Sequence, residues 1–266
     1  SSVRKYVEPF VGGGAVFFDI VTKYDLEEIC IADINRDLIN AYIVVRDYPE
    51  RLVSTLRKMH SDFISCDELG RKRYYNDVRM RYNSREFYYG DGKAECAAMF
   101  IFLNRTCFNG LYRINKSGKF NVPIGRYKNP LICDADNIML ISEKLKNVKI
   151  ECGDYRRIAN SIDKSTFVYL DPPYRPISKT SNFTAYTSDA FNDEEQIELA
   201  EFAGIISDKG GKFLLSNSDP KNEDPSDDFF EKLYRDYKIQ KVDAVRNIKC
   251  NGDKRGKIKE LFISNF

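Results

Sequence analysis

Short apolar runs alternate with helical stretches near both ends of the chain. The runs share a high content of β-branched and aromatic residues, as buried strands do, and they cover residues 5–7, 29–32, 148–152, 167–170 and 211–217. Residues 36–45 and 193–207 have the spacing of helices, while 240–248 and 258–266 predict a closing pair of strands. Because strands that alternate with helices form a mainly parallel sheet covered by helices, the pattern predicts an α/β fold.

The middle of the chain departs from this pattern. Residues 47–146 are charged, aromatic and helical in rhythm, without alternating strands. Within them, the turn signal 115–118 lies between two short strand-like runs and predicts a β-hairpin. We therefore predict one domain made of residues 1–46 and 147–266, with a second domain of residues 47–146 inserted into it.

Composition narrows the possible functions. The chain has 266 residues, 42% of them hydrophobic and 31% charged, as in an ordinary globular protein. Its formal net charge is only +2, so a nucleic acid would have to be bound by a local basic cluster. Seven cysteines without C-x-x-C spacing and one histidine, His60, argue against zinc sites, disulfides and histidine-dependent nucleophiles. No apolar run has transmembrane length, and we expect a cytoplasmic protein that binds neither membrane nor metal.

A local basic cluster does occur in the predicted inserted domain. Residues 104–130 contain no acid, although the chain has 40, and carry six basic residues: Arg105, Arg113, Lys116, Lys119, Arg126 and Lys128. Arginine can pair with guanine and asparagine with adenine, while the remaining cations suit phosphates. A solvated basic loop is the alternative interpretation. The Asn and aromatic residues interleaved with the charges favour nucleic-acid binding.

The first predicted strand is followed by three consecutive glycines. Residues 12–14 let the backbone turn sharply and approach a ligand, although a plain strand–helix connection would also explain them. Asp33 ends the second predicted strand, 20 residues after Gly13, where folds of this kind bind the two ribose hydroxyls of a nucleoside. The alternative for Asp33 is the N-cap of the helix over 36–45. The two roles can coexist, and with the glycine turn we favour ribose binding.

The apolar run 167–170 leads into Asp171-Pro172-Pro173-Tyr174. Because proline cannot extend a ladder of strands, these residues lie at the carboxyl edge of the sheet, where open α/β folds bind ligands. The carboxylate of Asp171 and a proline carbonyl are acceptors suited to a planar amino group, and Tyr174 is suited to stacking on a base. A strand end followed by a turn beside a surface tyrosine is the alternative. Asp154 ends the run 148–152 in the same way and could accept from an adenine amine, or could start a helix.

Together these motifs resemble the Dam family of adenine-specific DNA methyltransferases. The resemblance follows the family's order over nearly the whole chain, and its segments are Glu8-Pro9-Phe10-Val11-Gly12-Gly13-Gly14, Asp33, Asn109-Gly110-Leu111-Tyr112-Arg113, 118–130, Asp171-Pro172-Pro173-Tyr174 and 181–186. It implies a Rossmann-like class I methyltransferase sheet (residues 1–46 and 147–266) that binds S-adenosyl-L-methionine. The inserted residues 47–146, helical with a β-hairpin, would then be the target-recognition domain.

The resemblance also assigns roles to residues. The cofactor would be lined by Pro9, Phe10 and Gly12, with its ribose on Asp33, its adenine against Ile34, and the adenine amine on Asp154 next to Tyr155. Asp171, Pro172 and Tyr174 would be catalytic: the first two accept from the target amine, and the tyrosine stacks on the flipped adenine.

In this family the hairpin reads GATC in double-stranded DNA. By position, Arg113 would contact a guanine. The residues expected to contact DNA are Arg105, Phe108, Asn109, Leu111, Arg113, Asn115, Pro123, Arg126, Lys128 and Tyr186. We expect the enzyme to be a monomer.

One departure from the family leaves alternatives open. A Lys-Trp-x-Gly-Gly-Lys segment usually precedes the glycine turn and contacts the cofactor, and this sequence starts too late to include it. We expect that segment upstream of residue 1. A sequence-specific DNA-binding module with impaired catalysis is one alternative, and a methyltransferase acting on RNA adenine or a protein amide is another. Aspartate rather than asparagine at position 171, and the basic hairpin, argue against the latter.

Overall fold

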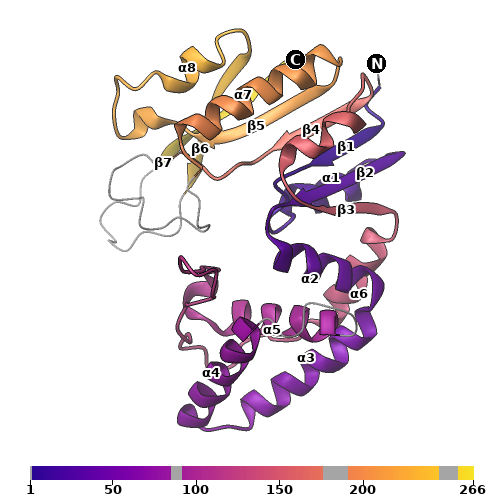
Figure 1. Ribbon diagram of the computed structural model, residues 1–266, viewed down its shortest axis with the longest axis vertical. Helices are drawn as coiled ribbons and strands as arrows, with labels where there is room; N and C mark the ends of the chain where they lie inside the picture. The colour runs from indigo at the N-terminus through magenta and orange to yellow at the C-terminus, as the bar shows by residue number, and fades with distance from the viewer. Residues whose placement is uncertain (1, 85–91, 176–190, 246–256) are drawn as a thin grey trace. The chain divides into compact units, whose positions relative to one another are not determined.

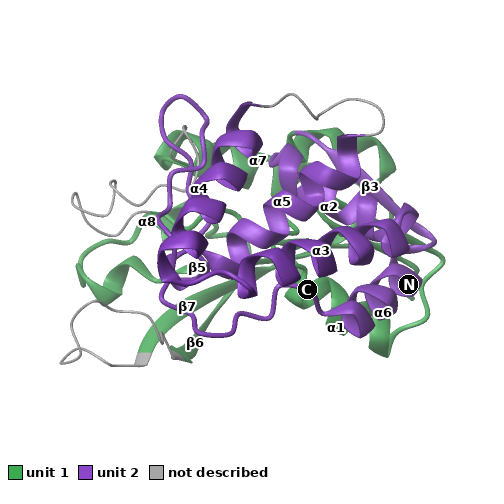
Figure 2. Ribbon diagram, turned by 90° about the horizontal axis from the view of Figure 1, so that it is seen from below, with its two compact units in different colours: residues 1–32, 154–185, 189–266 green, residues 33–153, 186–188 purple. Residues whose placement is uncertain are grey.

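The computed structural model describes residues 2–84, 92–175, 191–245 and 257–266. The predicted DNA contact Tyr186 and the motif 181–186 lie outside these residues. The chain divides into two compact units, each coloured separately in Figure 2. We call residues 1–32, 154–185 and 189–266 the first unit, and residues 33–153 and 186–188 the second unit.

The sheet has seven strands in the order β3-β2-β1-β4-β5-β7-β6 (Figure 1). The strands are β1 (Lys5–Glu8), β2 (Glu28–Asp33), β3 (Val148–Cys152), β4 (Thr166–Leu170), β5 (Lys212–Ser218), β6 (Lys238–Val245) and β7 (Lys257–Ser264). β1 pairs in parallel with β2 and β4, and β4 with β5, while β7 is antiparallel to both β5 and β6. This is the predicted α/β sheet, and its strand order is that of the Rossmann-like methyltransferase fold.

The register of the parallel strands brings three chain segments to one edge of the sheet. Val7 is paired with Val168, and Leu170 with Leu215. The residues that follow, Glu8, Asp171 and Ser216, therefore meet at the carboxyl ends of neighbouring strands. Strands β1 and β4 also flank the point where the strand order reverses, which is where sheets of this type bind ligands.

Helices of the first unit cover this sheet. They are α1 (Ala15–Lys23), α7 (Asp193–Asp208), α8 (Phe229–Leu233) and the 3-10 helices η3 (Tyr155–Ser161) and η5 (Pro220–Asn222). A capping box starts α7, because the Asn192 side chain accepts from the backbone of Glu194 and Glu195 while the Glu195 carboxylate accepts from the Asn192 N–H. α7 lies against β5 (Figure 1) and buries Leu199, Phe202 and other apolar residues in one core with β4, β5 and α8.

The second unit is mainly helical. Its helices are α2 (Arg36–Asp47), α3 (Pro49–Ile64), α4 (Glu68–Ser84), α5 (Lys93–Thr106), α6 (Ala135–Leu145) and the 3-10 helix η2 (Phe108–Gly110). α5 contacts α2, α3 and α4 and is apolar over most of its circumference, as expected for a helix at the centre of a bundle. Within the described residues, no helix is long and apolar enough to cross a membrane.

The chain reverses at the predicted hairpin turn, but the flanking runs do not form regular strands. Asn115 and Lys119 are joined by a backbone hydrogen bond of 2.8 Å, and the pairing of the runs consists of the isolated bridges Ile114–Phe120 and Cys107–Ile124 in place of a continuous ladder. Side chains of α4 instead form hydrogen bonds with backbone groups that paired strands would bond to each other. The Asn83 side chain bonds both the N–H and the carbonyl of Phe120, and the Tyr75 hydroxyl donates to the Val122 carbonyl.

Candidate active site

The glycine turn leaves β1 with open space beside its backbone. Gly12 and Gly14 have positive φ angles of 48° and 74°, which glycine adopts without strain. Among the described residues, nothing lies within 4 Å of a Cβ built on Gly12 or Gly13. Gly14 directly precedes α1, so a ligand could approach the backbone here at the start of a helix.

Two residues predicted to line the cofactor lie together beside this turn. The rings of Phe10 and Tyr155 are 5.3 Å apart, and Phe191 contacts Phe10 edge-on at 6.1 Å. Tyr155 is also packed on Phe202 of the core, and burial raises the pKa of its phenol to about 12. The aromatic surface is thus fixed by the core, as a surface for a flat or apolar group must be.

Asp33 is the last residue of β2, as predicted, and it does not cap the following helix. Asn35 is the N-cap of α2, since its side chain accepts from the backbone of Asp37 and Leu38 at 3.0 and 3.2 Å. The alternative reading of Asp33 as this cap is therefore wrong. One oxygen of Asp33 accepts from the Asn35 N–H, and the neighbouring Ile34 is two-thirds exposed.

Asp154 follows β3 and takes the role that we gave as its alternative. Its side chain caps the 3-10 helix η3 by accepting from the Arg156 backbone at 2.9 Å. Its two oxygens also accept from the guanidinium of Arg156, at 2.7 and 2.8 Å, which holds the pKa of Asp154 below its usual value. Because an ionised carboxylate has about four lone-pair sites, Asp154 retains acceptor capacity for a ligand amine.

Asp171 leaves β4 and is held by the neighbouring strand. The Ser216 hydroxyl of β5 donates to one of its carboxylate oxygens at 2.7 Å, and among the described residues Asp171 forms no ion pair. The residue is exposed, yet desolvation of its carboxyl group by the surrounding protein raises the pKa of Asp171. The hydrogen bond from Ser216 partly offsets this rise. Pro172 is buried, and Tyr174 is half-buried with its pKa raised by burial.

A second carboxylate lies beside Asp171. Glu8, the last residue of β1, is 2% exposed and accepts a hydrogen bond from the Tyr6 hydroxyl at 2.5 Å. Burial raises the pKa of Glu8 to about 7, with a further rise from the charge of Asp171, while hydrogen bonds from Tyr6 and the Phe17 backbone lower it. The sheet edge thus carries two carboxyl groups with different environments.

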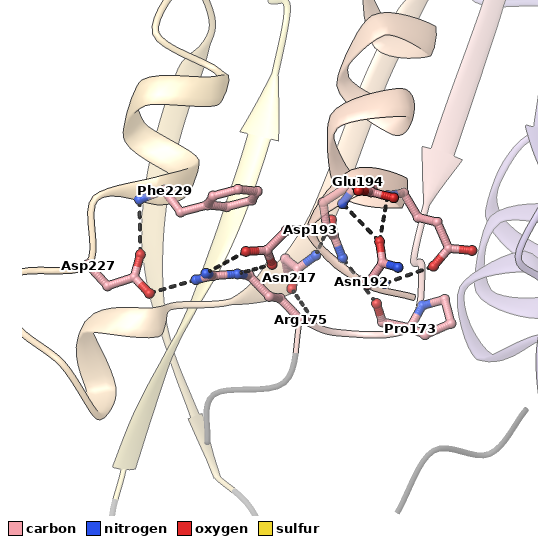
Figure 3. A network of polar contacts seen from close by, with 10 residues as sticks. Pro173, Arg175, Asn192, Asp193, Glu194, Asn217, Asp227 and Phe229 are labelled. Atoms are coloured by element: carbon pink, nitrogen blue, oxygen red, sulfur yellow. Dashed lines mark hydrogen bonds and ion pairs between the residues drawn. The ribbon is translucent and has the colours of Figure 1, made fainter. Parts of the chain in front are cut away.

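The residue after Tyr174 anchors the turn. Figure 3 shows the guanidinium of Arg175 between Asp193, which it contacts at 2.6 and 3.0 Å, and Asp227, at 2.6 Å. It also lies over the ring of Phe229, 4.3 Å from the centroid. Because a planar guanidinium has five donors in a fixed fork, these contacts fix the end of the turn against the start of α7 and the segment before α8.

Most of the predicted DNA contacts lie exposed in the second unit. The exposed ones are Arg105, Phe108, Asn109, Arg113, Asn115, Pro123, Arg126 and Lys128, whereas Leu111 is half-buried. Phe108 keeps 50% of its surface exposed, which is unusual for a phenylalanine. Asn109 has a φ of 54°, the only positive φ outside glycine in the described chain. Exposed aromatic and strained backbone positions of this kind are typical of binding surfaces.

Two of these side chains are partly engaged within the protein. The Asn115 side-chain oxygen accepts from the backbone of Ser117 and Lys119, both at 3.0 Å, and so shapes the turn. The guanidinium of Arg113 donates to the side chain of Asn121 at 2.8 Å. For Asn115 a local structural role thus stands beside the predicted contact with DNA.

Sequence reasoning missed Ser216, Asn217, Gln196 and Arg175. Ser216 and Asn217 end the predicted strand 211–217, so the rule that placed Asp171 at the carboxyl edge could have found them. Gln196 and Arg175 gave no local signal. Within the described residues, no group of three or more His, Cys, Asp or Glu side chains could hold a metal ion.

The strand order, with a carboxylate and a tyrosine on the turn after β4, places the chain among the Rossmann-like methyltransferases. Its sequence matches the family model of D12 class N6 adenine-specific DNA methyltransferases over residues 1–248, and the chain belongs to this family. It therefore methylates adenine in DNA, and the methyl donor of this family is S-adenosylmethionine. The predicted family, fold and cofactor are confirmed.

Several curated relatives are similar over most of their length. The Type II methyltransferase M.MjaIII of Methanocaldococcus jannaschii is 48% identical, over 100% of this chain and 89% of that protein. The Type II methyltransferase M1.LlaDCHI of Lactococcus lactis is 38% identical, over 98% and 86%. The DNA adenine methylase of Escherichia coli K12 is 35% identical, over 96% and 84%.

Proposed function

We propose that this enzyme methylates the adenine of GATC in double-stranded DNA, after flipping that base out of the duplex, with Asp171, Pro172 and Tyr174 as its catalytic residues. The observation that carries this proposal is the position of Asp171. It follows β4 at the switch point of the sheet, held by Ser216, on the same edge as the open glycine turn after β1.

The proposed chemistry is a direct displacement. Asp171 and the Pro172 carbonyl accept from the adenine amine, so that its lone pair is available to a carbon electrophile, and Tyr174 stacks on the base. A methyl group on a sulfonium leaving group is what S-adenosylmethionine supplies when bound. With the cofactor bound, the amine nitrogen would form the N–C bond as the S–C bond breaks, the sulfur would leave as a neutral thioether, and one amine proton would pass to water. Positioning and the negative charge of Asp171 beside the developing positive nitrogen account for much of the acceleration.

Residues of the first unit, together with Asp33 at the end of β2 and the following Ile34, suit the cofactor. The open space at Gly12 and Gly13 would let the cofactor approach the backbone, and the packed rings of Phe10 and Tyr155 would offer it an aromatic surface. Asp33 would accept from the ribose hydroxyls with the exposed Ile34 against the adenine ring. Asp154 would accept from the adenine amine through its remaining lone pairs.

DNA reading is assigned to the second unit. Arg113 would pair with a guanine of GATC, and Phe108, Asn109, Leu111 and Pro123 would touch or wedge the bases. Arg105, Arg126 and Lys128 would hold phosphates. The absence of any acid from residue 104 to residue 130 favours a DNA-facing surface. Tyr186 and Asn115 remain part of this proposal, as do a monomeric state and a cytoplasmic location.

The test uses labelled cofactor and pairs of duplexes that do or do not contain GATC. We expect label only on the GATC duplex, and none with Asp171→Ala, while that variant binds the duplex with unchanged affinity in a fluorescence titration. Turnover retained by Asp171→Ala would overturn the catalytic assignment. Equal labelling of both duplexes would overturn GATC as the target, without touching that assignment.

A further inference from the structure

A serine under the Asp-Pro-Pro-Tyr turn contacts both of its proposed catalytic side chains. Ser216 is 2% exposed and donates to Asp171 at 2.7 Å. Its oxygen also accepts from the Tyr169 hydroxyl at 3.3 Å, and its proximity lowers the pKa of the Tyr174 phenol against the larger effect of burial. A hydroxyl has one donor and two acceptor sites. Donation to the carboxylate therefore leaves the oxygen of Ser216 to accept from Tyr169.

A pair of buried amides holds the backbone on either side of Tyr174. Gln196 of α7 and Asn217 of β5 are both 0% exposed and bond each other at 3.3 Å. The Gln196 amide donates to the Pro173 carbonyl at 3.3 Å, and the Asn217 oxygen accepts from the Arg175 N–H at 3.2 Å. Figure 3 shows Pro173, Asn217 and Arg175 in this arrangement. Tyr174 is thus held at the peptide before it and at the peptide after it.

We infer that Ser216, Asn217 and Gln196 are positioning residues that set Asp171 and Tyr174 in the geometry for methyl transfer before DNA arrives. The inference rests on the proposed catalytic roles of those two residues. Ser216 engages one carboxylate oxygen of Asp171 and so assigns the other to the adenine amine. Gln196 and Asn217 fix the backbone of Tyr174, so that its ring is already in position when the adenine binds. Buried amides with every partner satisfied are costly to rearrange, which suits a rigid support.

The hydrogen bond from Ser216 has a consequence that a purely structural serine would not have. It stabilises the ionised form of Asp171, so its removal raises the pKa of that carboxyl. Transfer needs the ionised form, so the acidic limb of the rate profile should move to higher pH. The other titratable groups around this site are Glu8 from β1, Tyr169 from β4, Tyr174, and Glu260 from β7, which faces the two phenols.

The experiment compares Ser216→Ala and Ser216→Thr, which keeps the hydroxyl, with Ser218→Ala as a matched control. Ser218 is 1% exposed on the same strand, and the proposal assigns it no catalytic role. For each full-length variant, kcat, KM for GATC duplex and the pH profile of kcat are measured. A Glu8→Gln background is included because Glu8 also titrates near neutral pH.

In Ser216→Ala we expect kcat to fall about tenfold or more, as for loss of a hydrogen bond to a charged group, with KM within about twofold. The acidic limb of the kcat profile moves to higher pH both in the wild-type background and in the Glu8→Gln background. Ser216→Thr returns the limb to its wild-type position, and Ser218→Ala resembles the wild type. Gln196→Met should likewise lower kcat, without moving the limb.

An unchanged kcat and limb in Ser216→Ala, or an equal loss in Ser218→Ala, would overturn the inference. Asp171→Ala distinguishes failure of the positioning role from failure of the catalytic assignment. If Asp171→Ala is inactive while Ser216→Ala resembles the wild type, only the positioning role fails. If Asp171→Ala remains active, the catalytic assignment itself fails.

Discussion

Glu8 and Asp171 end two adjacent parallel strands, and Glu8 is buried while Asp171 is exposed. Burial, and after it the charge of Asp171, raises the pKa of Glu8 from an ordinary value of 4.5 to about 7. Burial also raises the pKa of Asp171, so both carboxyl groups at this sheet edge are displaced upward from their ordinary values. The shift at Glu8 predicts that the stability of the fold depends on pH up to about neutrality.

Stability should fall as the pH rises through the range in which Glu8 ionises. A carboxyl whose pKa is higher in the folded state stabilises the fold fully below pH 4.5, and this contribution is lost as the pH rises through about 7. The rise in the pKa of Glu8 from 4.5 to about 7 corresponds to about 3 kcal/mol in the free energy of unfolding. Glu8→Gln removes it while an amide oxygen remains to accept from Tyr6. Urea unfolding at pH 5 and pH 8 should show a smaller loss of stability in Glu8→Gln than in the wild type, and equal losses would refute this.

Arg175 should stabilise the first unit through its fork. Arg175→Ala leaves the carboxylates of Asp193 and Asp227 without their shared cation, and we expect a loss of about 1–3 kcal/mol in urea unfolding. Arg175→Lys should recover only part, because an ammonium cannot reproduce the fork. Arg235→Ala is the control, since its side chain is 80% exposed and the expected change is within about 0.5 kcal/mol. A similar loss of stability in Arg175→Ala and Arg235→Ala would contradict a stabilising role for the ion pairs of Arg175 with Asp193 and Asp227.

Arg113 should contribute to specificity more than to general affinity. If Arg113 pairs with a guanine, Arg113→Ala weakens binding to a GATC duplex by about 1–3 kcal/mol. The difference in affinity between this duplex and one without GATC becomes smaller. Competition titrations at fixed salt measure both affinities. Arg235→Ala removes the same charge from an exposed position and should leave the ratio of the two affinities unchanged. A uniform loss on both duplexes in Arg113→Ala would instead indicate a phosphate contact.

Asn83 of α4 should support residues 104–130, which we propose bind DNA. Its side chain accepts from the Phe120 N–H at 2.8 Å and donates to the Phe120 carbonyl at 2.9 Å. Asn83→Ala leaves both groups unpaired, so we expect weaker DNA binding with little change in kcat at saturating DNA. Asn76→Ala, an exposed position on the same helix, serves as the control. Unchanged DNA affinity in Asn83→Ala would show that the segment holds its shape without this contact.

Local pattern accounts for the elements that the sequence predicted correctly. The apolar run 167–170 lies within β4, and Asn192 begins α7 because its side chain satisfies the first free N–H groups of the helix. The Asp-Pro-Pro-Tyr turn follows from proline, which ends a ladder wherever the strand lies. The hairpin shows the limit of such reasoning. Its turn depends on Asn115, a local residue, whereas its flanking runs depend on α4, which sequence reading did not connect to them.

By itself, the sequence predicted the strands of the sheet and the helices over 36–45 and 193–207, the positions of the glycine turn and Asp171, and the family that the motifs resemble. Only the tertiary structure decided that Ser216 holds Asp171 across 45 positions of the chain, that Glu8 is buried beside it, and that Gln196 reaches the turn. The reason is physical: strand register and helix packing are set by the burial of side chains distant in sequence. Periodicity within one segment does not contain that information.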